Sequence, residues 1–147
     1  MHSTMNWQWD DPYILPVTAE QEQLDGLGHV NNVSYLRWLE AAAWAHSIAL
    51  GIGLDEFKGL DRAMVARRHE LDYLLPCQLG DELLVGTWIT SNDCKLSMER
   101  AYQIVRPLDN KTVFTGMTRW VCVALRSGKP KRMPAEFITA YQPGASS

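Results

Sequence analysis

A carboxylate, an imidazole and two carboxamides stand close together just before an amphipathic stretch. Asp25, His29, Asn31 and Asn32 fall within eight residues, and the helical apolar spacing of Val33–Leu50 follows directly. The first N–H groups of a helix lack intrahelical partners, and the positive end of the helix dipole lies there. Such an end polarises a carbonyl as readily as it holds an anion. With a fixed carboxylate just upstream, this spacing indicates attack on an activated acyl group.

Asp25 is the residue in this set that can begin such a reaction. An ordinary Asp carboxyl has a pKa near about 3.9 and is ionised at neutral pH. It can attack the carbonyl carbon of an activated acyl group to give an anhydride, or it can take a proton from an attacking water, and the sequence leaves both routes open. Gly26 and Gly28 leave backbone N–H groups unshielded, so we expect them to polarise the substrate carbonyl. The competing interpretation is a tight turn in which Asp25 caps backbone N–H groups.

The segment resembles hot-dog-fold acyl-CoA thioesterases of the 4-hydroxybenzoyl-CoA thioesterase and short-chain acyl-CoA thioesterase type. The family pattern Asp-x-x-Gly-His-Val-Asn-Asn-x-x-Tyr-Leu, followed by an aromatic-Leu-Glu-Ala stretch, is matched by residues 25–36 and 38–41. Weaker similarity continues through Pro76, Gly80–Glu82 and Lys129–Pro134, so that the resemblance covers roughly residues 13–141. It implies an α+β hot-dog fold, in which one long central helix is wrapped by an antiparallel sheet of five or six strands. It also implies homodimers or homotetramers.

The resemblance implies that Asp25 is catalytic, and it bears differently on the neighbouring residues. Plant acyl carrier protein thioesterases share a similar pattern, and the positions of Asp25 and His29 belong to their active site. Leu27 replaces an Asn of that pattern, which favours a mechanism resting on the carboxylate. Asn31 and Asn32 are expected as helix caps, each worth about 1 kcal/mol, or as groups that orient the thioester oxygen or the water.

Glu40 is a second candidate for the catalytic carboxylate, because another hot-dog thioesterase branch carries its acid on the central helix. Its spacing from Val33 and Leu36 places it on the predicted inward face of the helix. A buried Glu needs a partner there, so the alternative is a structural bond to the sheet or to His29. Tyr35 is expected either in the wall of an acyl pocket or in the packing of helix on sheet.

Cationic residues near the last predicted strand are candidates for binding the phosphates of the substrate carrier. Lys129, Lys131 and Arg132 cluster there, and Arg67 belongs to a second basic pair. The alternative is a solvated run of charge. Because phosphate-loop, dinucleotide-binding and metal-ligand patterns are missing, we expect no cofactor beyond the coenzyme A or phosphopantetheine of the substrate itself.

Composition agrees with one compact domain. The chain has 147 residues, 46% hydrophobic and 21% charged, which suffices for a single core. A net charge of −3 argues against nucleic acid as a partner, and no apolar run is long enough to span a membrane. The three cysteines, Cys77, Cys94 and Cys122, are far apart and are expected to be reduced, and we expect a cytoplasmic location.

The pattern along the chain predicts an N-terminal arm (1–12), a single domain (13–141) and a short tail (142–147). Within the domain we expect the Val33–Leu50 helix, capped by Asn31 or Asn32 and stopped by Gly51, and a helical turn near 54–59. Strands are predicted at 13–23, 65–75, 82–91, 97–105 and 112–125, separated by Pro, Gly, Asn and Asp turns.

Three functional hypotheses remain: an acyl thioester hydrolase, an enoyl-thioester hydratase of the hot-dog type, and a protein that binds an acyl or aromatic ligand without turning it over. The hydratase branch usually spaces its Asp and His one residue further apart and adds a hydrophilic catalytic loop that this sequence lacks. The site, not the fold, therefore favours hydrolysis of a small-molecule acyl thioester.

Overall fold

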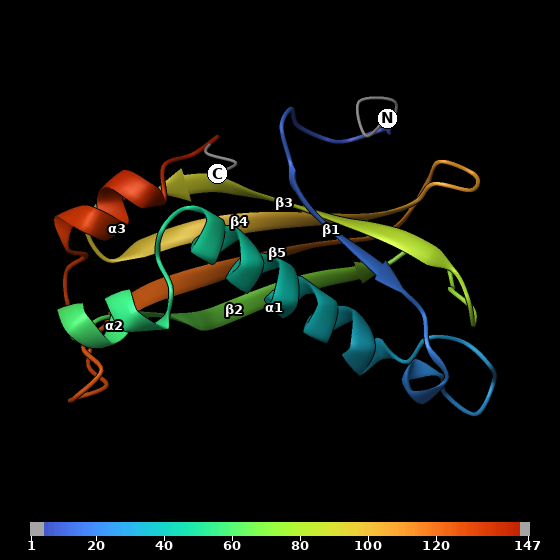
Figure 1. The fold of residues 1–147 in the computed structure, drawn as a ribbon, viewed down its shortest axis with the longest axis horizontal. Coiled ribbons are helices and arrows are strands. Elements are labelled where there is room, and N and C mark those ends of the chain that lie inside the picture. The colour runs from blue at the N-terminus through green and yellow to red at the C-terminus, as the bar shows by residue number, and fades with distance from the viewer. Residues whose placement is uncertain (1–4, 145–147) are drawn as a thin grey trace.

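One long helix lies against a five-stranded antiparallel sheet in the computed structural model, which describes residues 5–144 (Figure 1). The order across the sheet is β1-β3-β4-β5-β2. The strands are β1 (Tyr13–Thr18), β2 (Ala63–Tyr73), β3 (Glu82–Asn92), β4 (Ser97–Arg106) and β5 (Lys111–Val123). The predicted α+β hot-dog arrangement is confirmed.

The central helix α1 (Asn32–Ala49) begins and ends where the sequence predicts. Asn31 is the N-cap, and its Oδ1 accepts a hydrogen bond from Ser34 N at 2.8 Å. Leu50 closes the last turn, and Gly51 follows with a φ of +93°, the left-handed conformation that commonly ends a helix. This cap fixes the position of the α1 N-terminus beside the loop that carries Asp25.

The core forms where α1 packs on one face of the sheet. Leu39 and Ala42 on α1 are fully buried against Val85 of β3 and Phe114 of β5, and Tyr35 stacks on Phe114 with ring centroids 5.2 Å apart. Successive strand residues point to opposite faces, so alternate residues of β3 face away from α1. Both faces of β3 are nevertheless buried.

The N-terminal arm covers the second face of β3. Trp7 and Trp9 each pack edge-on against Trp88, with ring centroids 5.8 Å and 5.3 Å apart, and Trp88 Nε1 donates to Asp10 O. Gln103 holds the same segment, because its Oε1 accepts from Gln8 N. Residues 5–12, the described part of the predicted arm, form a layer on the sheet, and their two tryptophans pack on the neighbouring β3.

Two further segments differ from the prediction. β1 ends at Thr18 because a 3-10 turn, η2 (Gln21–Gln23), follows, in which the Gln23 side chain accepts from Glu20 N. α3 (Ala135–Ala140) was not predicted, since six residues give too short a periodic signal. The predicted helical turn near residue 54 is confirmed as α2 (Leu54–Leu60).

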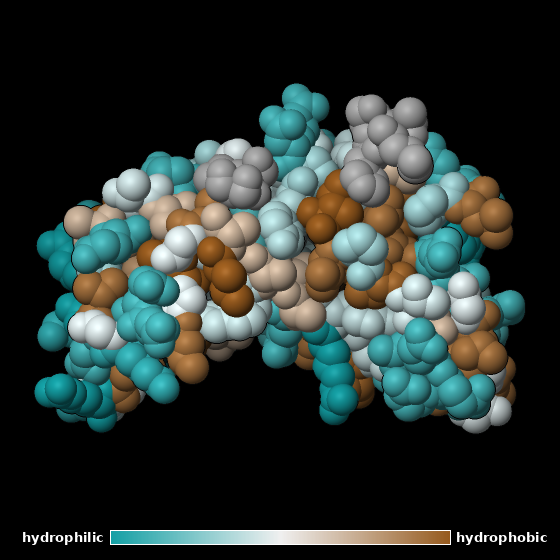
Figure 2. Space-filling view, in the orientation of Figure 1, coloured by the Kyte–Doolittle hydropathy of each residue, from teal (hydrophilic) through white to brown (hydrophobic). Residues whose placement is uncertain are grey.

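α2 and α3 close the end of the molecule that holds the C-terminus of α1 (Figure 1). A second apolar cluster fills this end, including Met64, Met98, Cys122 and Phe137. The face that carries α1 also exposes hydrophobic side chains here, among them Trp44, Ile48 and Leu54 (Figure 2). The molecule therefore has a polar loop at one end of α1 and an apolar region at the other.

Candidate active site

A short loop of residues 24–31 carries the predicted catalytic residues to the N-terminus of α1. Its ends pair through an isolated bridge between Leu24 and Val30. Asp25 N donates to His29 O at 2.7 Å, and Gly28 N donates to Asp25 O at 3.2 Å. Gly28 has a φ of +78°, which non-glycine residues rarely adopt. The chain thus makes a tight turn with the Asp25 side chain on the surface.

The carboxylate of Asp25 is held by one oxygen. Its Oδ1 accepts hydrogen bonds from Leu27 N at 2.8 Å and His29 N at 3.1 Å. These backbone donors, His29 first and then Leu27, lower the pKa of Asp25, because they stabilise the charged form. In the described part of the chain, Oδ2 makes no hydrogen bond. An ionised carboxylate therefore presents one uncommitted oxygen to solvent.

Of the two glycine N–H groups that the sequence suggested as donors to a substrate, only that of Gly26 is without an acceptor among the described residues. Gly28 N is used within the turn, so this N–H is not free to polarise a carbonyl. Among the described residues, the N–H groups of Gly26, Asn32 and Val33 have no hydrogen-bond acceptor. The last two belong to the first turn of α1, where intrahelical acceptors do not exist.

His29 and the two asparagines lie around this carboxylate in different roles. His29 is half-buried and meets Asp25 through backbone groups, while its own strand-like pairing is with Gln78. The side-chain oxygen of Asn31 accepts the hydrogen bond that caps the helix. Asn32 is exposed, and its carbonyl accepts from Tyr73 Oη at 3.2 Å. The predicted cap is confirmed for Asn31, whereas Asn32 is the first helical residue.

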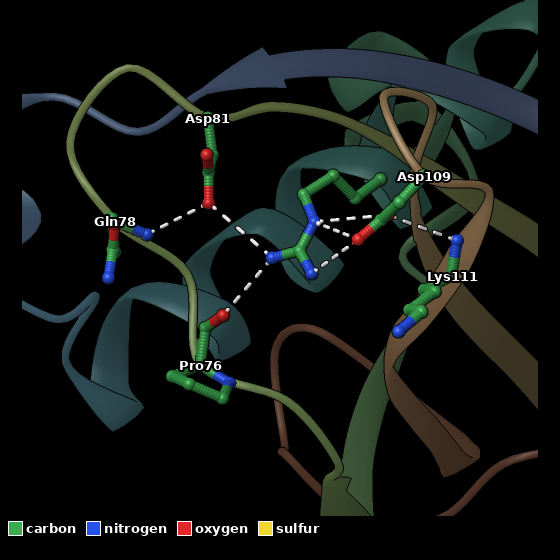
Figure 3. A network of polar contacts seen from close by, with 6 residues as sticks. Pro76, Gln78, Asp81, Asp109 and Lys111 are labelled. Atoms are coloured by element: carbon green, nitrogen blue, oxygen red, sulfur yellow. Dashed lines mark hydrogen bonds and ion pairs between the residues drawn. The ribbon is translucent and has the colours of Figure 1, made fainter.

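A second loop, residues 76–81, contacts the Asp25 loop and holds it in place. Val30 N donates to Cys77 O, and the 76–81 segment is in turn held by Arg106 of β4 (Figure 3). Arg106 Nη1 donates to Pro76 O at 3.2 Å and lies 3.6 Å from Asp81 Oδ2, while its Nη2 binds Asp109 Oδ2 at 2.9 Å. Asp81 Oδ2 also accepts from Gln78 N.

The Arg106 network ties the Asp25 loop to the β4–β5 hairpin. The side-chain bond to Arg106 holds the pKa of Asp109 below its usual range. Gly80 and Asp81 belong to the family resemblance, whereas no sequence pattern indicates a role for Arg106. Its partners are fixed only when distant segments meet.

Glu40 lies elsewhere than expected, whereas Tyr35 takes one of its two expected places. Glu40 is exposed, as is Val33 seven residues before it, so it is not part of the buried face of α1. The buried stripe runs instead through Tyr35, Leu39 and Ala42. Tyr35 is a core residue, and burial raises its pKa. The structure thus places Tyr35 in the packing of helix on sheet.

The basic residues lie far from Asp25 within one chain. Lys129, Lys131 and Arg132 are exposed on the segment after β5, where Arg62 Nε donates to Arg132 O. This segment lies at the α2–α3 end of the molecule, and the Asp25 loop lies at the opposite end (Figure 1). Arg67 is exposed on β2, at the irregularity in its pairing with β5.

The described residues contain no group of three or more His, Cys, Asp or Glu side chains arranged to hold a metal ion. They also contain no helix long and apolar enough to cross a membrane. All three cysteines are free.

Comparison with protein families decides the assignment. Residues 19–140 match the thioesterase-like superfamily, which is most of the chain. The chain belongs to this superfamily. The resemblance stated from the Asp25 motif is confirmed, and membership supports a thioester hydrolase.

Solved structures share the fold of this superfamily member. It is similar to a 1,4-dihydroxy-2-naphthoyl-CoA thioesterase from Synechocystis, with a TM-score of 0.79, 22% identity, and coverage of 88% of this chain and 94% of that chain. A hypothetical protein from Staphylococcus aureus in complex with CoA has a TM-score of 0.83 and 18% identity, covering 92% and 84%. YbaW, a probable thioesterase from Escherichia coli, has a TM-score of 0.75 and 22% identity, covering 87% and 95%. A comparison with curated protein sequences gives no match.

Proposed function

We propose that this protein hydrolyses acyl-CoA or acyl carrier protein thioesters to a free acid and a thiol, with Asp25 as the reacting carboxylate. The observation that carries the proposal is the state of Asp25. It is exposed, its pKa is lowered by backbone donors, and its Oδ2 is uncommitted. A carboxylate anchored in this way keeps its charge and its direction, which both acyl transfer and base catalysis need.

Two routes use this geometry. In the first, Oδ2 attacks the thioester carbon, the C–S bond breaks, the thiolate leaves, and water then hydrolyses the resulting anhydride. In the second, Asp25 takes a proton from a water that attacks the same carbon directly. Both routes develop negative charge on the carbonyl oxygen. The unused N–H groups of Asn32 and Val33, with the positive end of the α1 dipole, suit that oxyanion.

We propose coenzyme A as the carrier of the acyl group. We also propose that a second copy of the chain contributes basic residues near Asp25. Similar folds carry CoA or are named as CoA thioesterases. β2 is an edge strand of the sheet, and α1 exposes the apolar residues Val33, Trp44 and Ile48. Antiparallel pairing of two β2 strands would bring the Lys129–Arg132 segment of one copy toward the Asp25 end of the other. We therefore propose a homodimer, or a tetramer built from it, and sedimentation velocity measures its mass directly.

The deciding experiment measures thiol release from a panel of acyl-CoA and aroyl-CoA thioesters. We expect Asp25→Asn to lower kcat/KM by about 10²- to 10⁴-fold, because the lost group takes part in bond making or proton transfer. Glu40→Gln is the matched control, since it also replaces an exposed carboxylate by its amide on a nearby element. Both variants are compared with the unaltered chain by circular dichroism.

Each outcome discriminates among the three hypotheses. Loss confined to Asp25→Asn supports the proposed mechanism, while loss confined to Glu40→Gln would move the catalytic role to the helix. If the unaltered chain cleaves no thioester, hydration of enoyl thioesters is assayed next. A chain without either activity would be a ligand-binding protein.

The three free cysteines suit a reducing compartment, and we propose a cytoplasmic location.

A further inference from the structure

A pocket of about 260 Å³ lies at the end of α1 remote from Asp25, between that helix, α2, α3 and the sheet. Its lining is mostly apolar, and Trp44, Phe57, Met64, Met98 and Trp120 contribute to it. An apolar pocket with few polar groups is the usual form of a small-molecule site. One of its lining residues is a buried, charged side chain, which is unusual in such apolar surroundings.

That residue is Arg100 of β4, which is only 1% exposed. Its Nη1 donates to His46 Nδ1 at 2.7 Å and to Thr87 Oγ1 at 3.2 Å. Because a guanidinium can only donate, Nδ1 of His46 is an acceptor, so neither partner carries negative charge. Its Nε has no hydrogen-bond acceptor within the described structure.

A counter-ion for Arg100 is also missing from the surrounding side chains. None of the ion pairs between described residues involves Arg100. The tyrosines nearest to it, Tyr102 and Tyr141, are neutral at physiological pH, because burial raises the pKa of both, that of Tyr141 to about 12. A buried cation without an opposite charge costs several kcal/mol, so such a group is ordinarily paired.

We propose that this pocket binds a small organic acid, with the apolar body of the ligand among the aromatic and methionine side chains and its carboxylate on Arg100. A planar carboxylate matches the fork of a guanidinium, which has donors left over once Nη1 is committed to His46 and Thr87. Within one chain the pocket lies at the end of α1 remote from Asp25, and binding of a free acid is measured without any thioester, so the test is read apart from the thioesterase activity.

Glu40 is the acid that also lines this pocket, so its part has to be settled by the experiment. It is exposed, whereas Arg100 is at the buried side of the pocket. If Glu40 served as the counter-ion of Arg100, the pocket would have no use for a second carboxylate. If it does not, replacing Glu40 by Gln removes a repulsive charge and leaves binding of the acid equal or tighter.

The test uses hexanoate and its neutral isostere hexanamide as probes, with tryptophan fluorescence and calorimetry as readouts, since Trp44 and Trp120 line the pocket. We expect the acid to bind roughly tenfold or more tightly than the amide, because a hydrogen bond to a charged group is worth more than one to a neutral group. This comparison needs only the unaltered chain. Equal affinity of the two probes, or binding of neither, would overturn the proposal.

Variants then test whether Arg100 supplies the positive charge that binds the acid. Arg100→Met should reduce binding of hexanoate to the level of hexanamide, and Arg100→Lys should retain part of the preference. Arg119→Met is the matched control, because Arg119 is an exposed arginine on β5 and should leave both affinities unchanged. An unchanged preference in Arg100→Met, or a preference for the acid that appears only in Glu40→Gln, would refute the assignment. If Arg100→Met does not fold, the Lys variant and the acid–amide comparison still decide.

Discussion

At the scale of single residues, the carboxylate of Asp25 is governed by backbone groups rather than by charged side chains. Two N–H donors on one oxygen favour the ionised form. The residue types and their spacing predicted the place of Asp25, His29 and the Asn31 cap. They misplaced Glu40, because apolar residues occur around much of α1 and periodicity alone could not tell the outer stripe of Val33 from the inner stripe of Leu39.

The lowered pKa of Asp25 sets the pH dependence of the proposed reaction. The reactive form is the carboxylate, which is present above the pKa of the folded protein and is lost as pH falls through it. Since that pKa lies below the model-compound value, 3.8, kcat/KM should stay level through mildly acidic pH and fall only below the ordinary Asp range. A profile of kcat/KM against pH, over the range in which circular dichroism shows a folded chain, checks this. A decline centred near neutrality would show that another group controls the reaction.

At the scale of elements, the site depends on two loops that meet only in the folded molecule. The Asp25 loop follows from local signals, namely the turn glycine and the helix cap. The 76–81 loop is positioned by Arg106. The partners of this arginine lie about 30 residues before it and three residues after it in the chain. Local sequence could predict the first loop and the strands, but not the contact between Val30 and Cys77 that joins the two loops. The short α3 was likewise hidden, since it is defined by packing of Phe137 and not by a periodic face.

Loosening the 76–81 loop should therefore impair catalysis without removing any reacting group. Arg106→Met deletes the bonds to Pro76 O and Asp109, so we expect kcat to fall by roughly 10- to 100-fold while KM changes little, because small displacements of a reacting group are costly. Lys111→Ala is the control, since only its backbone N–H binds Asp109. Steady-state kinetics on an aroyl-CoA substrate measures both constants. Full activity in Arg106→Met would mean that the loop holds its place without this clamp.

At the scale of the whole molecule, β3 is covered on both faces, by α1 and by the described part of the arm. The contact is close at Gly86 of β3, where a Cβ atom would lie 2.6 Å from Trp7 Cζ3. The sequence placed two tryptophans in the arm but could not say what they touch, because Trp88 and Gln103 are more than 70 residues away. This is a long-range contact with no local signature.

Gly86→Ala should therefore destabilise the fold by about 1–3 kcal/mol, as expected for an extra methyl group in a packed layer. Gly59→Ala in α2 is the matched control with the opposite sign. Nothing lies within 4 Å of a Cβ atom there, and alanine favours a helix over glycine by roughly 0.5–1 kcal/mol. Urea denaturation followed by circular dichroism gives both free energies of unfolding. Equal stability of Gly86→Ala and the unaltered chain would show that the arm shifts aside at no cost.

The clamp of Gln103 on the arm also bears on how the chain can be handled. Its amide binds Gln8 N through Oε1 and Asn6 O through Nε2, so one side chain replaces the strand neighbour that this part of the arm lacks. A chain trimmed to begin at Tyr13 would leave Trp88 uncovered and Gln103 without these partners on an open sheet. Residues 5–12 are thus a poor place for truncation when a shortened variant is designed, since their removal would expose apolar side chains of the sheet to solvent.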